Sequence, residues 1–326
     1  MIKKSGETII PDFIEEEFIS AMDRYFSNKY VYPSNEDCVK ITRISQSEER
    51  ERGYDGIITS IIPFYVQFKR SNFLTPKSSS KLIKDRESVS LKTQKGVYYF
   101  PLHKNELEFN QHNTMYKLAN DSYFKKKVFY AAPLFFRKGQ LDEVRSGSGN
   151  DYAYRYQPIE IYDFQIKSKF YQNRIPMFKN VITIPPHKIV NRGSESHIYS
   201  YTKEGEVCFH SDPEKYPEDF NPQNLWDFLS SLNNEEEITD LEKFTNHLMN
   251  ILPDIFGLKS NTPKFKSLLI TSLNRSLNFE IQNESLTIEK LLESLTPLDK
   301  LVIFEDVLKQ HFNIHQYVRY TVLELI

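Results

Sequence analysis

The sequence predicts a mixed α/β domain followed by an acidic helical module. Residues 11–136 alternate between helical and strand-like patterns, and helical spacing of apolar side chains returns from residue 225 onward. The two parts also differ in charge: residues 1–211 hold 32 Lys+Arg and 25 Asp+Glu, a net of +7, whereas residues 212–326 hold 10 and 19, a net of −9. We therefore expect one domain at 1–210 and a separate module at 211–326.

Composition excludes several classes of protein. The 326 residues are 39% hydrophobic and 26% charged, which is enough apolar material for a packed core. No apolar run approaches the ~18–20 residues of a membrane helix, and the N-terminus lacks a secretory apolar segment, so we expect a cytoplasmic location and no membrane partner. Cys38 and Cys208 cannot form a disulfide framework, and neither GxGxxG nor GxxxxGK[ST] occurs.

A first helix is expected over 11–28. Apolar residues recur at helical spacing from Ile14 to Tyr25. At 100° per residue Glu15 falls within the apolar arc, whereas Glu16 points away from it. A buried carboxylate is costly unless it is paired or bound to a metal, so Glu15 is a candidate site residue.

Strand-like runs follow at 38–44, 54–60, 63–70, 97–102 and 127–136, with a helix over 104–120 and short strands and turns over 155–210. The runs 54–60 and 63–70 lie so close together that we expect a hairpin turning near 61–62. The run 127–136 is the most strand-like, and we expect it in the middle of a sheet until Pro133. In the helix 104–120, Gln111, Met115 and Leu118 share one side.

Residues 71–96 are interpreted as a long loop, or flap, with a functional role, because loops of this length in compact domains are often functional. The basic residues proposed to contact nucleic acid are Arg70, directly before the flap, and Lys77, Lys81, Lys84, Arg86, Lys92 and Lys95 within it. A solvated loop without a partner is the alternative interpretation of such a charge run.

The acidic module is expected to be helical. The predicted helices cover 224–232, 237–256, 263–279, 287–294 and 297–312, with a last short element at 315–325. Because an acidic surface repels nucleic acid, we expect residues 211–326 to mediate self-association into a homo-oligomer or contact with a protein partner.

One constellation carries a chemical hypothesis. Gln67 and Lys69 are two residues apart on a predicted strand and share a face, and a turn near 61–62 would place Asp55 opposite residue 68. Carboxylate and other oxygen ligands hold Mg²⁺, which supports phosphodiester hydrolysis, and a neighbouring lysine orients water and offsets charge. Glu15 would supply a further ligand.

These residues and the element order resemble the PD-(D/E)xK nuclease superfamily, in particular its Mrr-like restriction endonuclease branch, whose second motif reads QxK. The resemblance implies a restriction-endonuclease-like αβββαβ core, a mixed central sheet flanked by helices. It implies that Asp55 is the central metal ligand, with Gln67, the Phe68 carbonyl and Glu15 as further ligands to Mg²⁺ or Mn²⁺. Lys69 would be the catalytic lysine.

The same resemblance suggests that Gln111 contacts the substrate, although Tyr116 follows it by five residues where the family's Q-x-x-x-Y pattern has four. It further implies an Mg-dependent endonuclease acting on DNA, with RNA left open, in restriction or anti-phage defence. Three alternatives remain: a nuclease-like fold that binds nucleic acid without cutting it, a scaffold subunit of a larger defence complex, or an ordinary structural strand bearing an exposed Lys69. The histidines show no metal-binding spacing.

Overall fold

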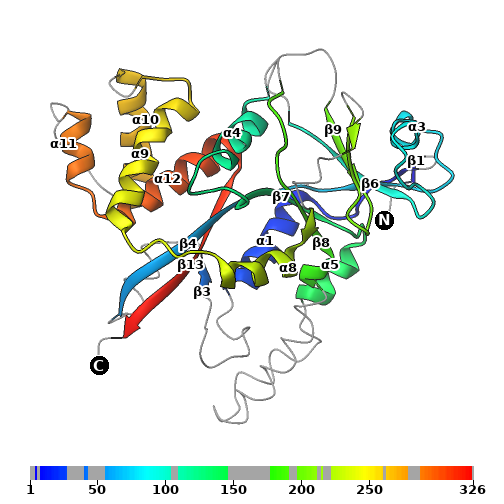
Figure 1. Cartoon of the computed structure of the whole chain (residues 1–326), viewed down its shortest axis with the longest axis horizontal. Helices are drawn as coiled ribbons and strands as arrows, with labels where there is room; N and C mark the ends of the chain where they lie inside the picture. Colours follow the sequence, from blue (N-terminus) through cyan, green and yellow to red (C-terminus); the bar gives the residue numbers. More distant parts are fainter. Residues whose placement is uncertain are drawn as a thin grey trace, which may run out of the picture. The chain divides into compact units, whose positions relative to one another are not determined.

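The computed structural model describes residues 4–5, 8–27, 40–42, 56–103, 109–145, 177–190, 197–210, 214–215, 222–259, 262–277 and 287–324. The protein is mixed α/β and contains two sheets (Figure 1). Its contacts define two compact units. Unit 1 comprises Met1–Cys38, Gln67–Ala119 and Val128–Asn234, and unit 2 comprises Val39–Val66, Asn120–Lys127 and Glu235–Ile326. Unit 2 therefore draws segments from both sides of the boundary predicted at residue 210, which stays a prediction.

Unit 1 contains an antiparallel seven-stranded sheet rich in aromatic residues. Its order is β1-β2-β5-β6-β9-β10-β11, with β1 Lys4–Ser5, β2 Thr8–Ile9, β5 Asn72–Leu74, β6 Val97–Pro101, β9 Ile198–Tyr201, β10 Val207–Phe209 and β11 Glu214–Lys215. Phe100 of β6 packs against Tyr199 and Tyr201 of the neighbouring β9. Aromatic side chains suit a pleated, half-buried surface, which explains why these short runs form strands.

Unit 1 also contains a second group of strands, next to the helices of the candidate site. It has the order β12-β8-β7, formed by β7 Val128–Pro133, β8 Val181–Ile184 and β12 Gln223–Asn224. The helices that the structure describes in this unit are α1 Glu15–Ser27, α3 Lys81–Ser88, α4 Asn110–Ala119, α5 Lys138–Arg145 and α8 Leu225–Ser231. α4 packs on β7, and α1 contacts α5. β7 is buried throughout, ends at Pro133 and bonds on both sides, so its predicted central place is confirmed.

Unit 2 combines strands with the predicted C-terminal helices. Those helices are α9 Leu241–Ile255, α10 Pro263–Leu277, α11 Ile288–Glu293 and α12 Pro297–Phe312, and Figure 1 shows α9, α10 and α12 side by side. α12 begins with a capping box between Thr296 and Asp299 and ends at Asn313, whose φ of 51° is the left-handed conformation that asparagine tolerates. The last element is not helical: β13 His315–Glu324 is a ten-residue strand that pairs with β3 Lys40–Thr42 and with β4 Gly56–Phe68.

The predicted hairpin near 61–62 is wrong. Residues 56–68 form one continuous strand, β4 Gly56–Phe68, whose last two residues belong to unit 1. Pro63 lies within this strand and is paired with Val318 of β13. A strand rises about 3.3 Å per residue, so the eleven steps from Gly56 to Gln67 separate the ends of β4 instead of bringing them together.

The predicted flap is not a bare loop. It contains β5 and α3, and Leu74, Ile83 and Val97 form a small hydrophobic core beneath it. Ser80 caps α3 by accepting a hydrogen bond from the Leu82 N–H. Among the described residues, no helix has the length and apolar character needed to cross a membrane.

Candidate functional site

Gln67 is a buried polar residue whose side chain has no hydrogen-bond partner in the part of the protein that the structure describes. It is the twelfth residue of β4, its side chain is 0% exposed, and neither its amide oxygen nor its amide nitrogen has a hydrogen-bond partner among the described residues. The following Phe68 packs edge-on against Phe18 of α1, so the local strand is anchored on that side. An amide in this position costs free energy unless it binds something, because buried polar groups are normally paired.

Lys69 lies two residues further along, on the same face by strand alternation. Its backbone N–H donates to the Ala131 carbonyl of β7 at 2.9 Å, which extends the pairing beyond β4. Its side chain is 7% exposed, and the ammonium donates to Gln111 Oε1 at 3.3 Å. Burial lowers the pKa of Lys69 to about 8, and the nearby Glu15 carboxylate opposes part of this shift. The alternative of an ordinary exposed lysine is thereby contradicted.

Glu15 lies at the start of α1 and is half-buried, whereas Glu16 is exposed, as the helical pattern predicted. Glu15 Oε2 accepts a hydrogen bond from the Arg70 backbone N–H at 3.3 Å, and the Arg70 guanidinium donates to the Phe13 carbonyl. The structure therefore brings Glu15, Lys69 and Gln111 together with the end of β4, all within unit 1.

Asp55 lies outside the described residues. Its predicted meeting with Gln67 and Lys69 depended on the hairpin that β4 replaces, so the geometric argument for Asp55 is lost. Within the described residues, no group of three or more His, Cys, Asp or Glu side chains is placed to hold a metal ion. The side-chain oxygen atoms that the described residues bring to this site include the Glu15 carboxylate and the Gln67 and Gln111 amides.

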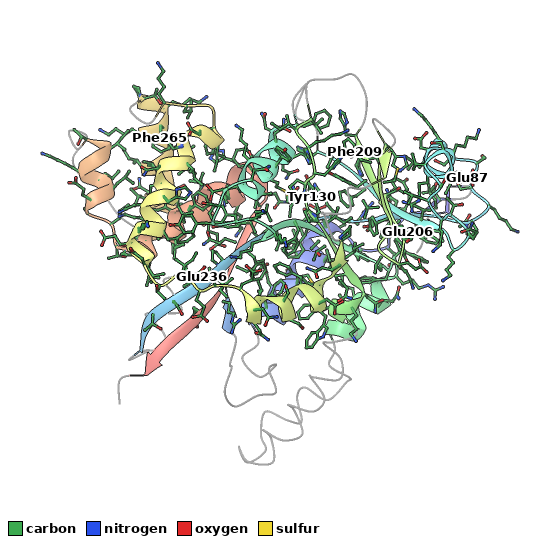
Figure 2. The ribbon with its side chains drawn as sticks, viewed as in Figure 1. Glu87, Tyr130, Glu206, Phe209, Glu236 and Phe265 are labelled. Carbon is green, nitrogen blue, oxygen red and sulfur yellow. The ribbon has the colours of Figure 1, made fainter. Side chains whose placement is uncertain are left out.

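Sequence reasoning missed two neighbours of Lys69. Tyr130 of β7, labelled in Figure 2, places its ring centroid 5.9 Å from the Lys69 ammonium. His112 of α4 lies within 2.7 Å of the Tyr130 hydroxyl. The signal was weak: His112 directly follows Gln111, and Tyr130 lies in the most strand-like run of the chain. Neither position departs from the pattern of an ordinary core residue.

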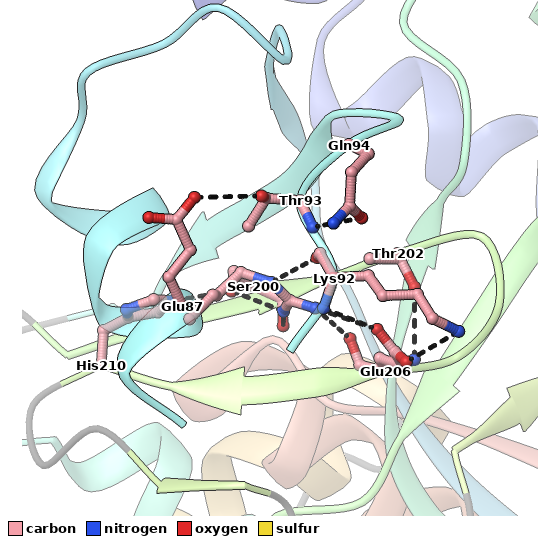
Figure 3. Close-up of polar contacts among 9 residues, drawn as sticks. Glu87, Lys92, Thr93, Gln94, Ser200, Thr202, Glu206 and His210 are labelled. Carbon is pink, nitrogen blue, oxygen red and sulfur yellow. Dashed lines mark hydrogen bonds and ion pairs between the residues drawn. The ribbon is translucent and has the colours of Figure 1, made fainter. Parts of the chain in front are cut away.

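The basic residues of the flap fall into three groups. Arg86 is buried, so its predicted contact with nucleic acid is wrong: its guanidinium donates to the backbone carbonyls of Lys92, Ser200 and Glu206 and to Ser200 Oγ. Figure 3 labels the three partner residues Lys92, Ser200 and Glu206. Lys92 and Lys95 are exposed and pair with Glu206 and Glu204.

The third group consists of Lys77, Lys81 and Lys84. All three are exposed, and no ion pair involves them within the part of the chain that the structure describes. They lie on α3 or in the turn before it, where their ammonium groups are accessible to a phosphate backbone.

Comparison of the sequence and structure with family models, curated proteins and solved structures gave no match.

Proposed function

We propose that the protein is a divalent-metal-dependent nuclease whose site lies in unit 1 at the end of β4. The observation that carries the proposal is the buried Gln67 amide, which lies two residues before a buried lysine and has no hydrogen-bond partner among the residues that the structure describes. A ligand would satisfy the amide, and an amide oxygen is a donor that Mg²⁺ and Mn²⁺ accept. This pattern supports the resemblance to the QxK branch of the PD-(D/E)xK nucleases.

The residues present suit such an ion. Glu15, Gln67 Oε1 and the Phe68 carbonyl would hold Mg²⁺ or Mn²⁺, because Mg²⁺ is commonly bound by one or two carboxylates and keeps several waters. When bound, the ion would offset negative charge on the scissile phosphate. Lys69 would orient the attacking water and balance charge, and Gln111 holds the Lys69 ammonium in place.

The substrate we propose is DNA, bound through its phosphates. Lys77, Lys81 and Lys84 supply exposed positive charge near the surface of α3, which favours binding that is sensitive to salt and independent of sequence. A role in restriction or anti-phage defence, a cytoplasmic location and a protein partner for residues 211–326 stay predictions.

A second candidate is a nuclease-like protein that binds nucleic acid without cutting it. The continuous strand β4 favours this candidate, because it removes the turn expected to bring Asp55 to the site. Glu15 is then the carboxylate that the described residues place beside the end of β4.

Digestion of DNA with purified protein tests the two candidates. Cleavage in Mg²⁺ or Mn²⁺ that stops with EDTA, and that Lys69→Met abolishes, supports the nuclease. Lys127→Met is the matched control, because Lys127 is a buried lysine at 8% exposure that pairs with Glu235 instead. DNA retained in a gel shift but uncut in either metal would support the binding protein, and neither retention nor cutting would refute both.

A further inference from the structure

Two consecutive hydrogen bonds link Tyr130, the ring next to the Lys69 ammonium, to His112 and to the Lys188 carbonyl. His112 Nε2 is 2.7 Å from the Lys188 carbonyl, and His112 Nδ1 is 2.7 Å from the Tyr130 hydroxyl. A carbonyl oxygen only accepts, so Nε2 carries a proton and donates it. The direction of the second bond then depends on the charge of the imidazole.

The imidazole of His112 is neutral at physiological pH. Burial lowers the pKa of His112 to about 3; the bond to the Lys188 carbonyl opposes the shift, whereas His187, His197 and Lys69 add to it. In the neutral ring Nδ1 is an acceptor, so the Tyr130 hydroxyl donates to it. The chain thus runs from Tyr130 to His112 to the Lys188 carbonyl.

These two hydrogen bonds fix the orientation of the Tyr130 ring, against which the Lys69 ammonium lies. The Tyr130 and His112 rings are nearly parallel, 4° apart, and the Lys69 ammonium lies 5.9 Å from the centre of the Tyr130 ring, within the range of cation–π attraction. α4 contributes to both contacts, since Gln111 accepts from the ammonium and the next residue, His112, fixes the tyrosine.

We propose that His112 and Tyr130 are positioning residues for Lys69: together they hold the aromatic face and the Gln111 acceptor that fix the ammonium at the end of β4. The proposal rests on the proposed nuclease function. Because Tyr130 and His112 act through Lys69, their loss should slow the chemical step and leave substrate binding nearly unchanged.

Tyr130→Phe tests this role, because it keeps the ring and removes only the hydroxyl. We expect kcat to fall roughly 10-fold with KM within about twofold, the size of effect seen when an outer hydrogen-bond partner of a site is lost. Tyr199→Phe is the matched control: Tyr199 is equally buried, and its hydroxyl lies 2.7 Å from His187 Nδ1. We expect it to leave kcat unchanged, and equal losses in the two variants would overturn the proposal.

Nuclear magnetic resonance tests this proposal independently of the nuclease assignment, because the measurement does not require the protein to cut DNA. The ¹⁵N shifts of the His112 ring should show the Nε2–H form in the wild type, and ¹³Cε labelling of lysine should show increased mobility of Lys69 in Tyr130→Phe but not in Tyr199→Phe. A protonated Nδ1, or an unchanged Lys69 signal in Tyr130→Phe, would refute the positioning role even if the protein cuts DNA. Confirmed signals in a protein that never cuts would refute only the nuclease.

Discussion

Replacing Gln67 by leucine should make the protein more stable and inactive at once. The Gln67 side chain is fully buried, and its two polar atoms lack hydrogen-bond partners among the described residues. Burying an unpaired polar group costs about 1–3 kcal/mol by mutational measurements. Leucine has a similar size and no polar atoms, so we expect Gln67→Leu to raise the free energy of unfolding of unit 1 by about 1–3 kcal/mol.

Gln111→Leu is the matched comparison. Gln111 is also buried, at 9% exposure, but its amide oxygen accepts a hydrogen bond from the buried Lys69 ammonium. Removing it leaves that ammonium without this acceptor, so the same substitution should lower the free energy of unfolding by about 1–3 kcal/mol. Opposite signs of the stability change at two glutamines of one site would distinguish a ligand position from a structural contact.

Urea unfolding followed by tryptophan fluorescence measures both changes. The sequence contains one tryptophan, Trp226, and it lies in unit 1 with both glutamines. DNA digestion in Mg²⁺ supplies the second readout. A less stable Gln67→Leu would show that the amide is bonded in the folded protein and would refute the reasoning, whereas a stabilised variant that still cuts would remove Gln67 from the metal site.

Three further predictions concern the flap and the buried histidine. Arg86→Lys should lower the free energy of unfolding of unit 1 by about 2–4 kcal/mol, because an ammonium cannot reach the Ser200, Glu206 and Lys92 carbonyls together; a change below about 0.5 kcal/mol by Trp226 fluorescence would contradict this. If Lys77, Lys81 and Lys84 are the phosphate contacts, a plot of the logarithm of DNA affinity against the logarithm of salt concentration should have a slope of about −2.7. Replacing all three by glutamine should make the affinity nearly independent of salt. The double variant Lys92→Gln, Lys95→Gln, whose lysines form ion pairs, should leave the slope unchanged. Burial lowers the pKa of His112 in the folded protein to about 3, so below pH ~6.5 the unfolded chain binds more protons than the folded one. The free energy of unfolding therefore decreases as the pH decreases in this range, by up to about 1.4 kcal/mol per pH unit. His112→Gln should flatten this dependence between pH ~6.5 and ~5, and equal slopes of the two proteins in urea titrations would disprove the prediction.

Local pattern predicted the elements well where neighbours in sequence decide the structure. The helical spacing that turned Glu15 inward and Glu16 outward holds in α1, and Gln111, Met115 and Leu118 are buried on α4 as their shared side implied. These features follow from the 3.6-residue period of a helix. They need no knowledge of what the helix packs against.

Pairing between distant segments could not be predicted in this way. The closeness of the runs 54–60 and 63–70 suggested a hairpin, yet β13, from the C-terminal part of the sequence, supplies a pairing partner along most of β4. The flap was similar: Arg86 was predicted to be a surface cation, but its guanidinium donates to the Ser200 carbonyl of β9 and to the carbonyl of Glu206, the residue before β10, which lie 114 and 120 residues away in sequence.

Two buried polar residues therefore break the local pattern for different reasons. Arg86 donates to several acceptors and behaves as a structural group, whose removal should cost stability. Gln67 has no acceptor or donor within the described residues, so the fold gains nothing from its amide. Departures from a consistent core that stability does not explain are expected at functional sites. The contrast between these two residues, more than any sequence motif, is the reason to assign the candidate catalytic site to the end of β4.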